Sequence, residues 1–371
     1  MKKLLLIILV VVLIACTSST ESDNITSTAL SVDETTTTLS SENDNSNETT
    51  TTSLGNTYEF DSEKMSPFTG VELPPELWLK RPRRVLAFKI DNNLNARPQS
   101  GLDAADSVFE ILVEGGMTRF LAFFYDKTSD YLGPIRSARP TDPTLIRPYG
   151  GILVVSGATA GLVPQIRELG VPVLEEQSSP AMFRISTRSA PHNLYADTEL
   201  VRGVVDSKGL PFNPPPSPIY EFGNKQDNWI EGAARVTVKY SDFTTIIWKL
   251  DGNLYSRFII DGYASTKDPV AHNNINREDE VKILQTETIA IIQGPIYVDD
   301  ATTLPSVLTV GVGPVKLFHN GNFIEGTWRR NDISEPFELF DENQDPIYVP
   351  QSKQWVHILP LESSEVNWSE S

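Results

Sequence analysis

The chain has 371 residues, a formal net charge of −18 and a pI of about 4.7. Such an acidic excess argues against a nucleic-acid partner, and the single cysteine, Cys16, excludes an intrachain disulfide. The length exceeds that of one ordinary hydrophobic core, which favours two folded domains with accessory segments.

Residues 1–16 have the pattern of a bacterial lipoprotein signal peptide. Two lysines precede an apolar run at 4–14, which is too short for a bilayer span of about 20 residues. The run is followed by Ala15 and Cys16, a small residue before a thiol that can carry a lipid. We therefore expect lipid attachment at Cys16 and a place on the extracytoplasmic face of the cell membrane. A plain signal peptide or a membrane anchor, with an incidental cysteine, is the alternative.

Residues 17–57 are predicted to be a disordered tether. They consist largely of Ser, Thr, Asn, Asp and Glu, so they cannot bury enough apolar surface to offset the entropy cost of ordering. Residues 58–82 form a lead-in to the first folded domain, which we place at 83–209.

This first domain is predicted to be α+β or α/β, with a mixed sheet and helices. The apolar run at 84–90 is typical of a central strand, and Asp91 and Asn92 follow it directly. The run at 152–156 predicts another strand, followed by an amphipathic helix at about 160–169. Ligands of such sheets favour the carboxyl ends of strands, which makes Asp91 and Asn92 candidate ligand contacts.

The β-rich runs on either side of Gly115-Gly116 predict a hairpin with a two-residue turn. In that register residue 110 pairs with 121 and 112 with 119, so Glu110, Glu114 and Arg119 share one face. Two neighbouring carboxylates can divide into acid and base, although an adjacent arginine lowers both of their pKa values. A catalytic pair, a ligand site and a structural ion-pair network all remain open.

Two arginine-bearing loops and one histidine are the other candidates. Arginine offers a planar fork suited to carboxylate or phosphate, and His192 could act as a general base. Internal pairing of the arginines and a structural histidine are the alternatives. The predicted ligand contacts are Asp91, Asn92, Arg97, Gln99, Glu114, Arg119, Arg136, Ser137, Arg139, His192 and Asn193, and the catalytic candidates are Glu110, Glu114, Asp91 and His192.

The proline-dense residues 210–220 are predicted to be a linker. Short β-rich runs separated by Asp-Gly and Asn-Gly turns follow, so residues 221–360 are predicted to form a mostly β domain, a sandwich or a barrel. Residues 361–371 are predicted to be a polar tail. The histidines lack the spacing of a zinc site, and we expect neither a metal nor a cofactor.

Three stretches of the first domain carry a resemblance to a known family. They lie at 90–124 (IDNNLNARPQSGLDAADSVFEILVEGGMTRFLAFF), 133–140 (GPIRSARP) and 190–195 (APHNLY). These stretches are similar to the N-terminal domain of the YerB family of bacterial lipoproteins, which is also defined as the domain of unknown function DUF3048. Four later stretches resemble the C-terminal domain of that family, at 255–257 (YSR), 311–313 (GVG), 326–328 (GTW) and 353–356 (KQWV).

The resemblance covers roughly residues 80–360. It implies an extracytoplasmic, lipid-anchored protein with two domains, and it implies no particular reaction. The leading hypothesis is a non-catalytic binding or assembly module of the cell envelope, whose arginine loops contact an anionic wall polymer or a protein partner. The alternatives are a wall-active hydrolase or transferase that uses Glu110 or Glu114, and a solute-binding lipoprotein.

Overall fold

The computed structural model describes residues 60–78, 84–159, 161–210 and 217–371. The predicted signal peptide with Cys16, the predicted tether and most of the proline-dense linker lie outside these residues. Within the described residues, no helix has both the length and the apolar character needed to cross a membrane. Residues 60–210 are called the N-terminal half below, and residues 217–371 the C-terminal half.

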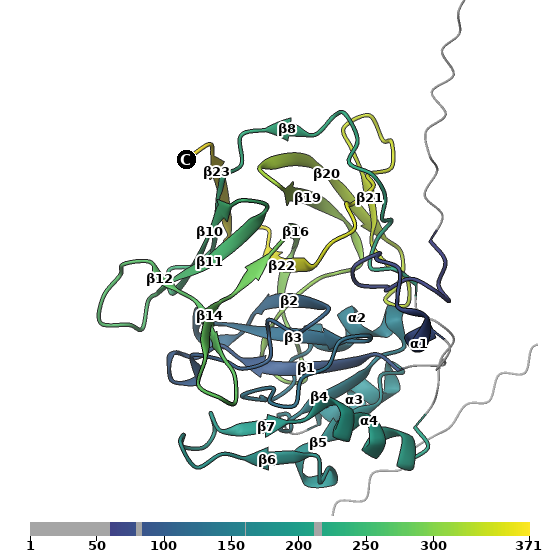
Figure 1. The fold of residues 1–371 in the computed structure, drawn as a ribbon, viewed down its shortest axis with the longest axis vertical. Helices are drawn as coiled ribbons and strands as arrows, with labels where there is room; N and C mark the ends of the chain where they lie inside the picture. The colour runs from purple at the N-terminus through teal and green to yellow at the C-terminus, as the bar shows by residue number, and fades with distance from the viewer. Residues whose placement is uncertain (1–59, 79–83, 160, 211–216) are drawn as a thin grey trace, which may run out of the picture. The chain divides into compact units, whose positions relative to one another are not determined.

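Strands from both halves form one mixed sheet of 11 strands. Its order is β21-β20-β19-β16-β22-β2-β3-β1-β4-β5, with β8 paired to β20 (Figure 1). The N-terminal half contributes β1 (Leu86–Asp91), β2 (Ser107–Leu112), β3 (Thr118–Phe124), β4 (Ile152–Val155) and β5 (Val173–Glu175). The C-terminal half contributes β8 (Ile230–Glu231), β16 (Thr288–Gly294), β19 (Gly311–His319), β20 (Asn322–Arg330), β21 (Glu338–Phe340) and β22 (Gln354–Pro360).

The seam between the halves is a direct pairing of β2 with β22, which run parallel. β22 also pairs in parallel with β16 and is buried along its whole length, as expected for a strand covered on both faces. The predicted fold class is confirmed, since the N-terminal half is a mixed sheet with few helices and the C-terminal half is mostly antiparallel. Main-chain hydrogen bonds across the seam nevertheless make the large sheet common to both halves.

A second sheet, of six strands, packs on one face of the large sheet. Its order is β12-β11-β10-β9-β23, with β15 paired to β11. Val238, Trp248 and Tyr255 of this sheet share one hydrophobic core with Ile291 and Trp355 of the large sheet. This face-to-face packing corresponds to the sandwich alternative. The strands are β9 (Arg235–Ser241), β10 (Thr244–Asp251), β11 (Leu254–Asp261), β12 (Val270–Ala271), β15 (Gln285–Thr286) and β23 (Glu365–Ser369).

Short helices cover the other face of the large sheet (Figure 1). Leu145 of α2 (Thr141–Ile146) and Ile166 of α3 (Leu162–Glu168) pack there with Phe109 and Leu121. α4 (Thr198–Ser207) packs instead into the core that the two sheets share. The remaining helices are α1 (Pro75–Trp78), η1 (Leu94–Ala96), η2 (Glu114–Gly116), η3 (Arg147–Tyr149) and η4 (Glu176–Ser178). The remaining strands are β6 (Met182–Arg184), β7 (Leu194–Ala196), β13 (Asn273–Ile275), β14 (Val281–Ile283), β17 (Ile296–Val298) and β18 (Pro305–Val307).

The β2–β3 hairpin exists, but its predicted register is wrong by one residue. Glu110 pairs with Phe120, and Leu112 pairs with Thr118. The connection is longer than two residues, because the amide of Val113 donates to the carbonyl of Met117 around the η2 turn.

A one-residue slip exchanges the two faces of a strand. Arg119 therefore lies opposite Ile111, on the face covered by helices. Glu110 lies opposite Phe120, on the face covered by the second sheet. The predicted grouping of Glu110, Glu114 and Arg119 on one face is thereby overturned.

Residues 361–371 are not a polar tail, since β23 pairs with β9 at the edge of the second sheet. Val366 and Trp368 alternate with polar residues and pack against the core, which is the period of a half-buried strand. The ring centroid of Trp368 lies 5.0 Å from that of Phe323 and 5.5 Å from that of Phe318. The indole therefore packs β23 against aromatic side chains of β19 and β20.

Candidate functional site

Asp91 ends β1 at the edge where the parallel strands β1, β4 and β5 have their carboxyl ends. This edge is where open α/β sheets bind ligands. The buried carboxylate has its Oδ2 atom 2.7 Å from Nδ1 of His192 and 3.2 Å from Nε of Arg136. The structure thus brings three predicted site residues to one point.

Glu114, at the tip of the β2–β3 hairpin, lies between two further arginines. Arg139 donates from Nε to Oε2 of Glu114 at 2.6 Å and from Nη2 to Oε1. Nη2 of Arg119 is 3.4 Å from the same Oε1. Burial raises the pKa of Glu114, but the hydrogen bond from Arg139 and the charges of both arginines outweigh this effect and lower the pKa to about 2.

We call Arg119, Arg136 and Arg139 the arginine cluster. Among the described residues, these three guanidinium groups form ion pairs with two carboxylates, those of Asp91 and Glu114. Burial first, and then the charge of Arg139, lower the pKa of Arg119 to about 10, although Glu114 and Asp91 act in the opposite direction. Within the described part of the chain, the Arg136 guanidinium makes an ion pair with Asp91 but no hydrogen bond. The arrangement can therefore accept a further anion.

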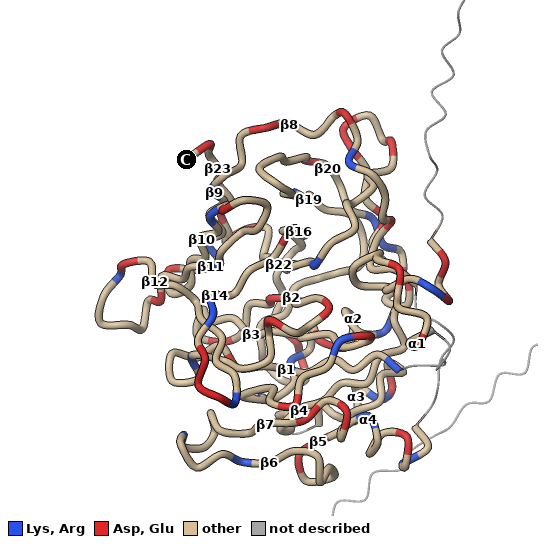
Figure 2. The backbone as a smooth tube through the Cα atoms, in the orientation of Figure 1, with Lys and Arg blue, Asp and Glu red and all other residues tan. Residues whose placement is uncertain are grey.

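The charge excess of the cluster is local. The whole chain carries a net charge of −18, and Figure 2 shows acidic and basic residues interspersed over the strands and loops of both halves. An anionic ligand would consequently meet repulsion over much of the molecule and attraction at the cluster.

A buried ion pair lies next to the cluster and holds the backbone of Arg139. Nζ of Lys89 lies 2.6 Å from Oδ1 of Asp142, and both side chains are fully buried. Burial lowers the pKa of Lys89 to about 8 despite this partner. The other carboxylate oxygen of Asp142 accepts from the main-chain amide of Arg139 at 2.7 Å. Neither residue was among the candidates predicted from the sequence, although a lysine inside the apolar run at 84–90 was a usable signal.

Glu110 lies apart from the cluster and forms an ion pair across the seam between the two halves. Nη2 of Arg257 reaches both of its carboxylate oxygens, at 2.7 and 2.8 Å, and both side chains are fully buried. Thr118 and the indole of Trp355 donate to the same carboxylate at 2.8 and 3.0 Å. A carboxylate enclosed in this way cannot reach a substrate, so Glu110 is structural rather than catalytic.

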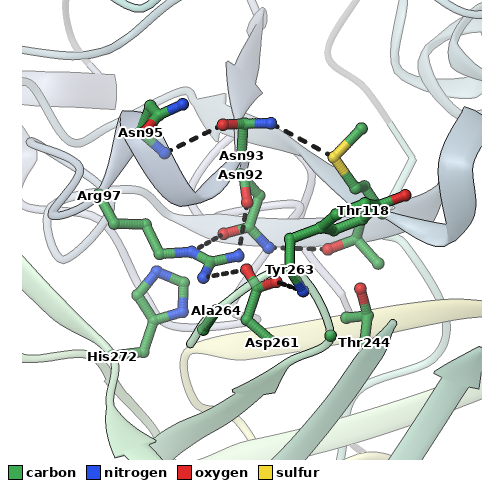
Figure 3. A network of polar contacts seen from close by, with 12 residues as sticks. Asn92, Asn93, Asn95, Arg97, Thr118, Thr244, Asp261, Tyr263, Ala264 and His272 are labelled. Atoms are coloured by element: carbon green, nitrogen blue, oxygen red, sulfur yellow. Dashed lines mark hydrogen bonds and ion pairs between the residues drawn. The ribbon is translucent and has the colours of Figure 1, made fainter. Parts of the chain in front are cut away.

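Arg97, Asn92 and Gln99, three predicted ligand contacts, also bind within the protein. Figure 3 shows Arg97 between the halves, with Nη1 donating to Oδ2 of Asp261 at 2.6 Å and Nε donating to Oδ1 of Asn92 at 3.0 Å. Gln99 donates to the carbonyl of Asp91 at 2.9 Å and contacts Nε2 of His272 at 2.7 Å. These side chains hold the loop after β1 against the C-terminal half.

Of the two remaining candidates, Ser137 positions an arginine of the cluster and Asn193 positions the loop of His192. The carbonyl of Ser137 accepts from Nη1 of Arg119 at 2.9 Å. Asn193 is buried and donates to the carbonyl of Ile185 at 3.1 Å, which holds the loop that carries His192. A shallow pocket of about 350 Å³ adjoins this region, lined by Ser156, Gly157, Ala158, Glu175, Glu176 and Gln177. Among the described residues, no group of three His, Cys, Asp or Glu side chains is placed to hold a metal ion.

Comparisons with known proteins agree with this architecture. Residues 68–211 match the N-terminal domain, and residues 235–356 the C-terminal domain, of DUF3048, described as a protein of unknown function. The chain is 26% identical over 309 residues to "Putative lipoprotein YerB" of Bacillus subtilis (strain 168), which covers 82% of this chain and 89% of that protein.

The crystal structure of YerB protein from Bacillus subtilis has a similar fold. Its TM-score with this chain is 0.68 at 24% sequence identity, over 82% of this chain and 99% of that one. The resemblance stated from the sequence is thereby confirmed. With both of its domains matched in the expected order, the chain belongs to the DUF3048 family, whose members include YerB.

Proposed function

We propose that this chain is a lipid-anchored binding module of the cell envelope, which recognises an anionic group of a wall polymer at the arginine cluster. Support for the anchor comes from the pattern of residues 1–16 and from the description of YerB as a lipoprotein. An anchor at Cys16 would keep the folded halves within reach of the wall, on the extracytoplasmic face of the membrane.

The observation that carries the proposal is the incomplete pairing of the cluster. Three guanidinium groups share two described carboxylates, and Arg136 makes no side-chain hydrogen bond within the described residues, its buried Nε beside Asp91 included. Its side chain is 25% exposed, so a ligand can reach it from solvent. Carboxylate and phosphate are the groups that an arginine fork binds best.

Replacing Arg136 and Arg139 together with alanine should weaken binding to purified wall material at least about tenfold, because each hydrogen bond to a charged group contributes about 1.5–3 kcal/mol. Co-sedimentation of the detergent-solubilised full chain measures the binding. The matched control is the double change Arg167→Ala and Arg277→Ala, at exposed arginines outside the cluster. If the cluster variant loses a captured envelope protein instead, the ligand is a protein. If it loses neither, the proposal is wrong.

The solute-binding alternative has less support in the geometry. Solute-binding proteins close about a hinge between two bodies. In this chain β2 pairs directly with β22 across the seam, and the buried ion pair of Glu110 with Arg257 crosses it as well. Opening the seam would expose both charges and break a strand pairing.

A wall-active hydrolase or transferase is the second candidate, and the Asp91–His192 contact favours it. An aspartate that hydrogen-bonds Nδ1 of a histidine orients the ring and leaves Nε2 to act as a base. Nε2 of His192 makes no hydrogen bond within the described residues, and the side chain is 18% exposed. Glu114 is a poor general acid, since its pKa of about 2 keeps it ionised.

If this second function is correct, the full chain should release soluble fragments from purified wall material, and His192→Ala should abolish the release. The expected loss is at least about a hundredfold, the usual contribution of general acid–base catalysis. The control is His319→Ala, a histidine of β19 outside the cluster. The absence of fragments with the unaltered chain would rule this function out.

A further inference from the structure

Glu114 is the one exposed member of the contact that fills the fork of Arg139. Its side chain is 39% exposed, whereas those of Arg119 and Arg139 are 6% and 7% exposed. Both carboxylate oxygens are used, since Oε2 accepts from Nε and Oε1 from Nη2 of Arg139. An external carboxylate or phosphate would use the same two donors, because the planar fork of arginine binds two oxygens on one atom.

Arg119 and Arg139 also make hydrogen bonds that do not involve Glu114. The carbonyl of Ser137 accepts from Nη1 of Arg119 at 2.9 Å, and the carbonyl of Ala138 accepts from Nη1 of Arg139 at 2.7 Å. Asp142 fixes the backbone of Arg139. The donors that face Glu114 are therefore positioned in part by bonds that Glu114 does not make.

The turn that carries Glu114 is held by the C-terminal half. Ser241 and Thr244 donate their hydroxyls to the carbonyl of Gly116 at 2.6 and 2.9 Å, and the hydroxyl of Tyr263 donates to the carbonyl of Gly115 at 2.7 Å. Both glycines have positive φ, of 71° and 69°, so the turn adopts a conformation that other residues resist. Figure 3 shows Thr244 and Tyr263 beside Asp261, in the part of the network that the C-terminal half contributes.

We propose that Glu114 is an internal stand-in for the ligand. Its carboxylate occupies the donors of Arg119 and Arg139 until an external carboxylate or phosphate displaces it. This inference rests on the proposed function of the cluster and adds how access to it is controlled. The C-terminal half sets the resting position of Glu114 through the three hydroxyls that hold residues 115 and 116. Loosening that hold should favour displacement.

The test is titration of the full chain, in detergent, with inorganic phosphate and separately with succinate, followed by calorimetry. Glu114→Gln should bind at least one probe about tenfold tighter or more, because the variant loses the charged carboxylate that competes with the probe for the donors of Arg139. Adding Arg139→Ala to that variant should remove the gain. Tyr263→Phe, which keeps Glu114 and weakens the hold on its turn, should tighten binding by a smaller factor. Glu325→Gln, which removes an exposed charge of β20 that pairs with Lys316 of β19, should change nothing.

The outcomes separate this inference from the proposed function. If the unaltered chain binds through Arg139 and neither Glu114→Gln nor Tyr263→Phe binds more tightly, the stand-in role is wrong while the anion site remains. If none of the variants binds either probe and wall binding is also insensitive to Arg136 and Arg139, both are wrong. Unfolding midpoints in urea check that each variant is folded, and Tyr263→Phe provides the answer should Glu114→Gln be unstable.

Discussion

Replacing Glu110 with alanine should lower the free energy of unfolding by about 3–5 kcal/mol, the cost of leaving a buried charge without its partner. Arg257 would become that charge. Its guanidinium carbon lies 5.1 Å from the ring centroid of Trp355, 5.5 Å from that of Phe120 and 5.7 Å from that of Trp248. Its side chain is fully buried, so water cannot take over the role of the carboxylate.

Urea unfolding of the full chain measures this loss. Glu325→Ala, at an exposed position of β20, should change the free energy of unfolding by less than about 0.5 kcal/mol. The double variant Glu110→Leu with Arg257→Met should recover most of the stability, because an apolar pair of similar volume often replaces a buried ion pair without loss. A loss below about 1 kcal/mol for Glu110→Ala would contradict the view that this pair secures the seam.

Acidification from about pH 6.5 to about pH 4 should lower the free energy of unfolding by about 3 kcal/mol through His357 alone. Burial lowers the pKa of this histidine from 6.5 to about 4, although Glu110 acts in the opposite direction. Between these values the unfolded chain binds a proton that the folded chain does not, so stability falls as the pH falls. Above pH 6.5 both states are neutral at this residue, and the full stability is present.

Hydrogen bonding explains why the folded state keeps His357 neutral. The indole nitrogen of Trp248 lies 3.0 Å from Nε2 of His357 and can only donate, so Nε2 must carry a lone pair. Nδ1 lies 2.8 Å from the hydroxyl of Tyr240, which in turn donates to the carbonyl of Glu110. Protonation of Nε2 would set two donors against each other in the core.

The measurement compares urea unfolding of the unaltered chain and of His357→Gln from pH 4 to pH 8. The amide oxygen of glutamine can accept from Trp248 without titrating. The variant should therefore lose the part of the pH dependence of the free energy of unfolding, the slope against pH, that His357 supplies. The pKa of Asp106 is raised well above its usual value by burial and by Asp126. Its contribution to the free energy of unfolding therefore grows as the pH falls, which is opposite to that of His357. It acts equally in both proteins and cancels in the difference. Equal slopes in the two proteins would contradict the assignment to His357.

Local sequence patterns sufficed for much of the fold and for part of the site. The apolar run at 84–90, the hairpin around Gly115-Gly116 and the β-rich C-terminal half are all present, because periodicity and turn residues act over a few neighbouring residues. Asp91, Arg136 and His192 were named in advance for a similar reason, since polar residues at strand ends and in loops are visible in the sequence.

The grouping of those residues depended on contacts that no local pattern contains. The register of one hairpin, set by the hydrogen bond between Val113 and Met117, sent Glu110 and Arg119 to opposite faces of the sheet. Glu110 then met Arg257, 147 residues away in the chain. The buried ion pair of Lys89 with Asp142 next to the arginine cluster likewise joins residues that are distant in the chain.

Composition and spacing thus predicted the strands, the anchor pattern and the residues able to do chemistry. Tertiary packing decided which charges are buried as partners across the seam and which remain open to a ligand. The physical reason is that the free energy of a charge depends on its burial and on its nearest opposite charge. Both quantities are properties of the assembled sheet, and neither is encoded in the residues that flank the charge in the chain.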